Sequence, residues 1–270
     1  IFDSGYKVLN NYYPFKDYWS ITGPFLDYIQ YIFFSIFGVN WKTYIFHAAI
    51  INTLLSLVTF FFFNQIGLRK SYSLIYSLSI CLLGYPSSGT PFMDHHASIF
   101  SLIALMTLIL ALKKNSNFYW YALPLILGIS FFSKQIPSAY FFILFAIVIF
   151  LYLSLKKFKD INFLIYLLLG SLSFIIIILI VVNINNISIK NIYIQYILYP
   201  LSIGQERGES LNLDLNNVFL QFKFIYFSLL LIPIPLLNLL KIKIKKNENL
   251  IDILILITFL ISIIVFLYSQ

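Results

Sequence analysis

Apolar and polar residues follow one another along this chain in long blocks rather than in strict alternation. Apolar runs are separated by short polar breaks that contain Lys, Asn, Gly and Pro. Blocks of this length are typical of helices that cross a hydrocarbon core about 30 Å thick, whereas strands of an outer-membrane barrel alternate at every second residue. The pattern therefore predicts an all-α fold, a polytopic transmembrane helical bundle of about eight spans. The runs cover residues 43–63, 71–83, 97–112, 118–132, 137–155, 161–182, 218–240 and 250–268.

Two polar segments are longer than simple turns. Residues 1–42 are rich in Tyr and Trp, which favours a segment that lies at the membrane interface. Because Ile1 is preceded by neither methionine nor signal peptide, we expect an N-terminally truncated fragment that lacks an upstream helix. We expect a single transmembrane domain over 1–270: an external interfacial loop (1–42), six spans (43–182), a long external loop (183–217) and two last spans (218–270).

Composition supports the membrane assignment and limits the class of partner. The chain is 60% hydrophobic and 10% charged, with a mean hydropathy of +0.90, which leaves too little polar surface for a soluble fold. The net charge is +8, but the basic residues cluster at the ends of apolar runs, as topology signals do, so we expect no nucleic-acid partner. Cys81 is the only cysteine, which excludes a disulfide framework and a cysteine-rich metal site.

The charges are distributed unequally between the two faces of the predicted bundle. When the spans are threaded in alternation, the basic clusters fall on one face, which the positive-inside rule makes cytoplasmic. Most acidic residues fall on the other face, and this indicates a site at the external membrane surface. The basic clusters are Arg69-Lys70, Lys113-Lys114, Lys156-Lys157 with Lys159, and the lysines of 241–246; the external acids are Asp3, Asp17, Asp27, Asp94, Glu206, Glu209 and Asp214.

Asp3 and Asp17 are candidate site residues in the first external segment. Pro14 and the Gly23-Pro24 pair predict turns there, and aromatic neighbours would anchor them. A rigid loop would present both carboxylates to a substrate, whereas an amphipathic interfacial segment would simply turn them to water. For Asp27 we expect a position at the solvated rim.

Asp94 is followed directly by His95 and His96, at the start of a predicted span. A carboxylate beside an imidazole can bind a divalent metal or act as an acid–base pair. Adjacent histidines point in different directions on a helix, so at most one of them shares a site with Asp94, and an Asp at a helix start can also be an ordinary cap. His47, alone in an apolar span, is expected to be a hydrogen-bonded packing residue.

Two external cations are candidates for binding phosphate. Lys134 ends the fourth predicted span close to the lipid headgroups, where a lysine can hold a lipid phosphate or extend its ammonium to the interface. Arg207 lies in the long loop between Gly204 and Gly208, where it could bind phosphate or be solvated.

These residues, in this order, resemble the GT-C superfamily of polytopic glycosyltransferases, in the branch of the protein O-mannosyltransferases and the lipid A aminoarabinose transferases. The resemblance covers residues 1–155, and Ser133 replaces the threonine of the family's Thr-Lys-Gln. It is carried by Asp3 in Phe-Asp-Ser-Gly-Tyr, by Tyr13 to Tyr18 with the downstream Gly23-Pro24, by Met93-Asp94-His95, and by Gly128 through Lys134-Gln135.

The resemblance implies an inverting glycosyltransferase that moves a sugar from a polyprenyl-phosphate donor to an acceptor hydroxyl on a lipid, glycan or protein. It also implies an integral membrane protein of the cell envelope, surrounded by membrane lipids, with the active site facing outside. The abundance of Phe, Ile, Asn, Lys and Tyr is typical of an AT-rich genome and favours a bacterium. The membrane would then be the bacterial inner membrane.

The resemblance also implies roles for the candidate residues. Asp3 would be the general base, and Asp94 with His95 would place the acceptor. Lys134, together with Arg207, would neutralise the departing phosphate. Asp17 would belong to the substrate-binding residues. The cofactor is left open; if it is a divalent cation, its candidate ligands are Asp3, Asp94 and His95.

Two functions of other classes remain possible on the sequence alone. A lipid-linked oligosaccharide transporter or flippase would also be polytopic, but it needs polar residues at mid-membrane, where these spans hold almost only Ile, Leu, Phe, Val and Ser. In a noncatalytic membrane subunit, the external acids would tolerate replacement.

Overall fold

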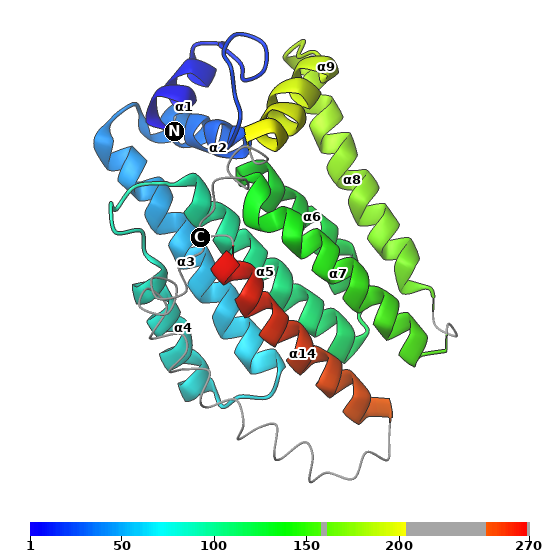
Figure 1. The fold of residues 1–270 in the computed structure, drawn as a ribbon. Coiled ribbons are helices and arrows are strands. Elements are labelled where there is room, and N and C mark those ends of the chain that lie inside the picture. Colours follow the sequence, from blue (N-terminus) through cyan, green and yellow to red (C-terminus); the bar gives the residue numbers. More distant parts are fainter. Residues whose placement is uncertain (158–160, 204–246, 269–270) are drawn as a thin grey trace, which may run out of the picture.

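The computed structural model describes residues 1–157, 161–203 and 247–268. Within this part of the chain the fold is the predicted all-α helical bundle (Figure 1). The predicted seventh span, 218–240, lies outside the described residues, as does the part of the long loop from 204 onward. The bundle helices are α3 (Trp41–Gln65), α4 (Lys70–Gly84), α5 (Met93–Lys114), α6 (Asn117–Ser133), α7 (Gln135–Leu155), α8 (Phe163–Ile184) and α14 (Asn247–Tyr268).

Not every helix of the bundle is long enough to cross a membrane. Among the described residues, four helices have the length and composition of a full span, namely α3, α5, α7 and α8. Helix α4 has 15 residues and α6 has 17, below the 20 or so that a straight crossing requires. Within the described residues, the apolar runs therefore predicted the positions of the bundle helices correctly, and four of these helices are complete candidate spans.

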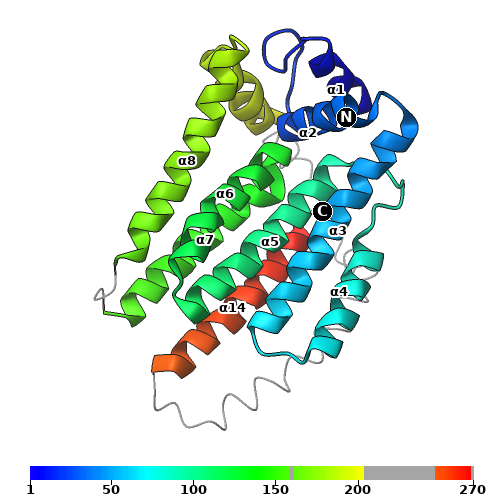
Figure 2. The same cartoon turned by 180° about the vertical axis from the view of Figure 1, so that it is seen from behind.

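Residues 1–42, which we call the first external segment after their predicted topology, contain more helix than the predicted loop implied. Helices α1 (Phe2–Leu9) and α2 (Pro24–Phe37) lie across one end of the bundle, together with α9 (Ile189–Ile192) and the π-helix η1 (Tyr193–Leu198), as both views show (Figures 1 and 2). Pro24 starts α2 because its fixed φ suits the first helical position. This end of the bundle is thus capped by short helices.

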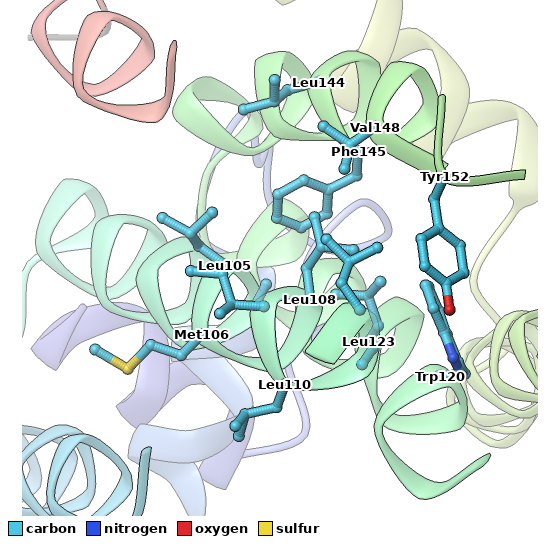
Figure 3. Close-up of a cluster of buried hydrophobic side chains, with 14 of the residues drawn as sticks. Leu105, Met106, Leu108, Leu110, Trp120, Leu123, Leu144, Phe145, Val148 and Tyr152 are labelled. Atoms are coloured by element: carbon cyan, nitrogen blue, oxygen red, sulfur yellow. The ribbon is translucent and has the colours of Figure 1, made fainter. Parts of the chain in front are cut away.

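Helix α5 forms the centre of the bundle. In its most apolar stretch of 18 residues, 78% of the residues are buried, against 11% in the corresponding stretch of α8. Helix α5 is therefore enclosed by protein, while most of α8 faces outward. Leu108 of α5, Leu123 of α6 and Phe145 of α7 meet in the main core, and Trp120 and Tyr152 belong to the same cluster (Figure 3). The outward-facing side chains of α8 are almost all Ile and Leu, as expected for a surface in contact with lipid.

The helices alternate in direction. Helices α3, α5 and α7 begin, and α6 and α8 end, at the end that α1, α2 and η1 cap (Figures 1 and 2). The described basic clusters lie at the opposite end, because Arg69-Lys70 joins α3 to α4, Lys113-Lys114 ends α5 and Lys156-Lys157 follows α7. This arrangement separates the capped end from the basic end, in agreement with the threading predicted from the sequence.

Candidate functional site

An ion pair between Asp94 and Lys134 lies at the capped end of the bundle. Asp94 stands in the first turn of α5, and Lys134 is the extended residue that joins α6 to α7. The Lys134 Nζ donates to Asp94 Oδ1. The side chains are 32% and 40% exposed, so the pair is held by the protein and still open to a ligand. Two candidates that are 40 residues apart in the sequence are thereby joined in one site.

Buried serines fix the backbone that carries Lys134. Ser101, Ser130 and Ser138 are fully buried where α5, α6 and α7 meet. The Ser130 Oγ lies between the other two, 2.8 Å from the Ser101 Oγ and 2.6 Å from the Ser138 Oγ. Ser130 Oγ also donates to the Ala97 carbonyl at 2.7 Å, and Ser138 Oγ donates to the Lys134 carbonyl at 3.2 Å. Small hydroxyl side chains let apolar helices approach closely. Their hydrogen bonds to one another and to carbonyl groups replace the hydrogen bonds to water that a buried hydroxyl loses.

Gln135, which was not among the predicted site residues, links three segments at this site. Its Nε2 donates to the Ile21 carbonyl at 2.7 Å and to the Tyr196 carbonyl at 3.0 Å. Ile21 belongs to the first external segment and Tyr196 to η1, so one amide joins both to the residue after Lys134. The sequence contained a signal for it, because Gln135 completes the Ser-Lys-Gln stretch that the family resemblance rested on.

The first external segment also contacts the residue before Asp94. Thr22 Oγ1 donates to Met93 Sδ at 2.9 Å. Gly23 has a φ of 72°, a conformation that favours glycine, and a Cβ there would lie 2.7 Å from Met93 Sδ, so a larger residue would have to displace the Met93 side chain. Residues 21–23 therefore lie beside the Asp94–Lys134 pair. They contact Met93, which precedes Asp94, and Gln135, which follows Lys134.

Asp3 and Asp17 lie on the surface of the first external segment. Asp3 is in the first turn of α1, and its Oδ2 accepts from Lys7 Nζ at 2.8 Å; its side chain is 76% exposed. Asp17 Oδ2 accepts from the Tyr13 backbone N–H at 2.8 Å and so closes its own turn. Neither carboxylate takes part in the Asp94–Lys134 ion pair, and the roles of both in catalysis and substrate binding stay predictions.

Asp27 is buried, so the prediction of a solvated rim position was wrong. Only 4% of the residue is exposed, and its carboxylate accepts from Ser4 Oγ and, at 2.9 Å, from the Tyr18 hydroxyl. Burial raises the pKa of Asp27 to about 6, while the two hydroxyl donors favour the charged form. Burial and the neighbouring Asp27 carboxylate raise the pKa of Tyr18 well above its ordinary value. An apolar sequence context gave no signal for this burial, because α1 covers Asp27 only in the tertiary structure.

The histidines are packed between helices. The His95 Nε2 is hydrogen-bonded to the Gly84 carbonyl at the end of α4, and so its ring faces α4 and not Asp94. His96 is fully buried beside His47, with ring centroids 5.0 Å apart. The His47 Nδ1 lies 2.9 Å from Gln30 Oε1, which confirms that His47 is a hydrogen-bonded packing residue.

A comparison with protein families identifies the kind of protein. The model of the dolichyl-phosphate-mannose-protein mannosyltransferase family matches residues 22–182, more than half of the chain. The chain belongs to this mannosyltransferase family. The match includes Asp94, Lys134 and Gln135, and it supports a membrane glycosyltransferase of the GT-C type. No curated protein and no solved structure matches the chain.

The predicted divalent-cation ligands of this mannosyltransferase-family protein are not gathered into one cluster. Asp3 pairs with Lys7, Asp94 with Lys134, and His95 with the Gly84 carbonyl. In the part of the chain that the structure describes, no group of three or more His, Cys, Asp and Glu residues is arranged to hold a metal. Arg207, the second predicted phosphate ligand, lies outside the described residues.

The buried carboxyl of Asp27 should make the stability of the protein depend on pH. Its pKa is about 6 in the folded state against 3.8 for the free group. Because the folded state holds this proton more tightly than the unfolded state, protonation of Asp27 stabilises the fold. This contribution to the free energy of unfolding is complete below pH ~4 and is lost as pH rises through about 6. The full effect corresponds to about 3 kcal/mol. In detergent, the midpoint of thermal unfolding of the wild type should rise between pH 7 and pH 5 relative to Asp27→Asn.

The matched control is Asp17→Asn, which removes an exposed carboxylate from the same segment. Its unfolding midpoint should change with pH as that of the wild type does. Identical pH dependence in the wild type and Asp27→Asn would contradict the burial of an ionisable Asp27.

Gln135→Glu should destabilise the capped end of the bundle. The carboxylate cannot donate to the Ile21 and Tyr196 carbonyls, so two partly buried acceptors lose their donor and face a negative charge. The free energy of unfolding should fall by about 1–3 kcal/mol at neutral pH. Gln65→Glu, at an exposed position at the basic end where the side chain accepts from Lys114, should not lower the unfolding midpoint, because the new carboxylate can still accept from that lysine. Equal midpoints for the two variants would show that the Gln135 link contributes nothing.

Proposed function

We propose that this protein transfers a sugar from a polyprenyl-phosphate donor to an acceptor hydroxyl, with inversion at the anomeric carbon, at the capped end of the bundle. The observation that carries the proposal is the Lys134–Asp94 ion pair, formed at a partly exposed position inside the region that matches the family. Transfer at a membrane surface needs a cation near the headgroups and a carboxylate that can reach an acceptor, and both types of group are found at this end.

In this proposal Lys134 stabilises the departing polyprenyl phosphate. Negative charge develops on the phosphate as the glycosidic bond breaks, and a fixed ammonium lowers the free energy of that transition state. Asp94 holds Lys134 in place before the donor arrives and then places the acceptor. Gln135 and the buried serines support this role, because a pre-positioned cation needs no reorganisation during the reaction. Arg207 would supply a second cation.

Asp3 is proposed as the general base. An acceptor hydroxyl has a high pKa and becomes nucleophilic when a carboxylate within hydrogen-bond reach takes its proton. Inversion requires the hydroxyl to attack opposite the leaving phosphate, so base and cation must lie on different sides of the sugar. Support comes from the exposure of Asp3 and from its place on α1, at the same end of the bundle as the start of α5 (Figure 1).

The capped end is proposed to face outward from a bacterial inner membrane. The described basic clusters lie at the other end of the bundle, and lysine and arginine are retained on the cytoplasmic side of a membrane. A lipid-linked donor and a lipid, glycan or protein acceptor would then meet at the external surface.

Lys134→Gln should abolish most of the transfer. We expect kcat/KM for the donor to fall about 100-fold, since a neutral amide cannot balance the phosphate charge. Lys134→Arg should retain part of the activity because it keeps the positive charge. The measurement is transfer of labelled sugar from a panel of polyprenyl-phosphate sugars, beginning with mannose, in membranes at equal expression. Lys113→Gln, at the basic end, is the control and should match the wild type; a Lys134→Gln variant as active as this control would rule out the phosphate role.

Asp3→Asn should lower kcat by a factor of about 10² to 10⁴ while the donor still binds, because the amide keeps the shape of the side chain but cannot accept the proton. Asp252→Asn on the exposed side of α14 is a control that should be fully active. Undiminished transfer by Asp3→Asn would remove Asp3 from the role of base. Absence of transfer by the wild type itself would favour a transporter or a noncatalytic subunit.

A further inference from the structure

Asp27 is an unusual residue for its position. It belongs to α2, a helix that is otherwise almost wholly apolar or aromatic, yet the carboxylate is 4% exposed. Burying a carboxylate is unfavourable unless hydrogen bonds compensate for the lost water. The two donors to Asp27 come from outside α2: Ser4 lies on α1, and Tyr18 lies in the connection between the helices. The group therefore joins three parts of the first external segment.

The contacts of Asp27 lead to Asp3 along two routes. Ser4, which donates to Asp27, is the residue after Asp3 in α1. Tyr18, the second donor, has Lys7 Nζ above its ring, 5.3 Å from the centroid. The same Lys7 Nζ pairs with Asp3 Oδ2 at 2.8 Å. The backbone and the side chain of Asp3 are thus both connected to the buried carboxylate.

Helix α1 packs closely against α2. A Cβ on Gly5 would lie 2.6 Å from the Gln30 Cβ, so the backbone of α1 lies directly against the Gln30 side chain of α2 at that point. Phe2 packs on Phe34 with ring centroids 4.8 Å apart. These contacts hold α1 against α2, and the hydrogen bond from Ser4 to the buried carboxylate adds a directional restraint.

We propose that Asp27 is a positioning residue that fixes α1, and with it the carboxylate of Asp3, relative to the rest of the capped end. This inference rests on the proposed function, in which Asp3 removes the proton of the acceptor. Asp27 itself touches no substrate, because Ser4, Tyr18 and α1 cover it. It acts through Ser4 and through the Tyr18–Lys7 contact, and a displacement of Asp3 by about 1 Å is enough to slow a proton transfer strongly.

The test compares Asp27→Asn with the wild type in the full-length protein. The amide keeps the size of the side chain, but it carries no charge and turns an NH2 group toward one of the two hydroxyls, so the charge-assisted hydrogen bonds from Ser4 and Tyr18 are weakened. We expect kcat for sugar transfer to fall about tenfold or more, with KM for the polyprenyl-phosphate donor within about twofold of wild type. The unfolding midpoint at pH 8 should not fall, because the variant no longer buries a charge.

Partner variants make the network itself testable. Tyr18→Phe and Ser4→Ala each remove one donor and should lower kcat by about threefold. The double variant Asp27→Asn with Tyr18→Phe should be no slower than Asp27→Asn alone, since both substitutions act on one network. Ser35→Ala, on the exposed side of the same helix, is the matched control and should have the wild-type kcat.

Hydrogen exchange of residues 2–9 in purified protein provides a readout that needs no activity. Exchange should be faster in Asp27→Asn than in the wild type and in Ser35→Ala. The proposal is overturned by wild-type kcat in Asp27→Asn, by a loss of activity that follows the loss of folded protein, or by unchanged exchange in α1. If the wild type transfers no sugar, the proposed function fails, and the exchange measurement alone decides whether Asp27 anchors α1.

Discussion

The connection between α6 and α7 carries the constraint on which the rest of the site depends. In a bundle surrounded by lipid, backbone and side-chain polar groups must find partners within the protein. Lys134 and Gln135 satisfy this requirement in three directions, toward α5 through Asp94, toward the first external segment through Ile21, and toward η1 through Tyr196. Because the buried serines hold the backbone of the same connection, the Lys134 ammonium is held at the capped end of the bundle with little freedom to move.

The cap formed by α1, α2 and η1 is assembled around this connection. Phe15, Val182 and Tyr196 bury a small apolar cluster between the first external segment and the end of α8. Polar contacts surround the cluster, such as Lys16 Nζ to the Asn185 carbonyl at 3.1 Å. Segments almost 170 residues apart in the sequence thus form one surface over the bundle. A surface held from several sides can present charged groups to a lipid-linked substrate without being rebuilt for each turnover.

The Asp27 network shows how a rigid cap and an exposed catalytic candidate can be combined. Asp3 must be accessible if it is to meet an acceptor, and an accessible side chain on a short helix is held by few contacts of its own. The buried carboxylate of Asp27 supplies the missing restraint from beneath. Its raised pKa is a consequence of the burial that this restraint requires.

Within the described residues, the sequence by itself determined the membrane class, the positions of the bundle helices and the gathering of the basic clusters at one end of the bundle, because these follow from composition and local periodicity. It also indicated Asp94 and Lys134 as candidate site residues, but it did not show that they form an ion pair. The burial of Asp27, the turning of His95 toward Gly84 and the double hydrogen bond of Gln135 were decided by tertiary structure alone. Each depends on which segment covers a side chain or offers it a carbonyl group, and such contacts between distant parts of the chain leave no periodic pattern in the sequence.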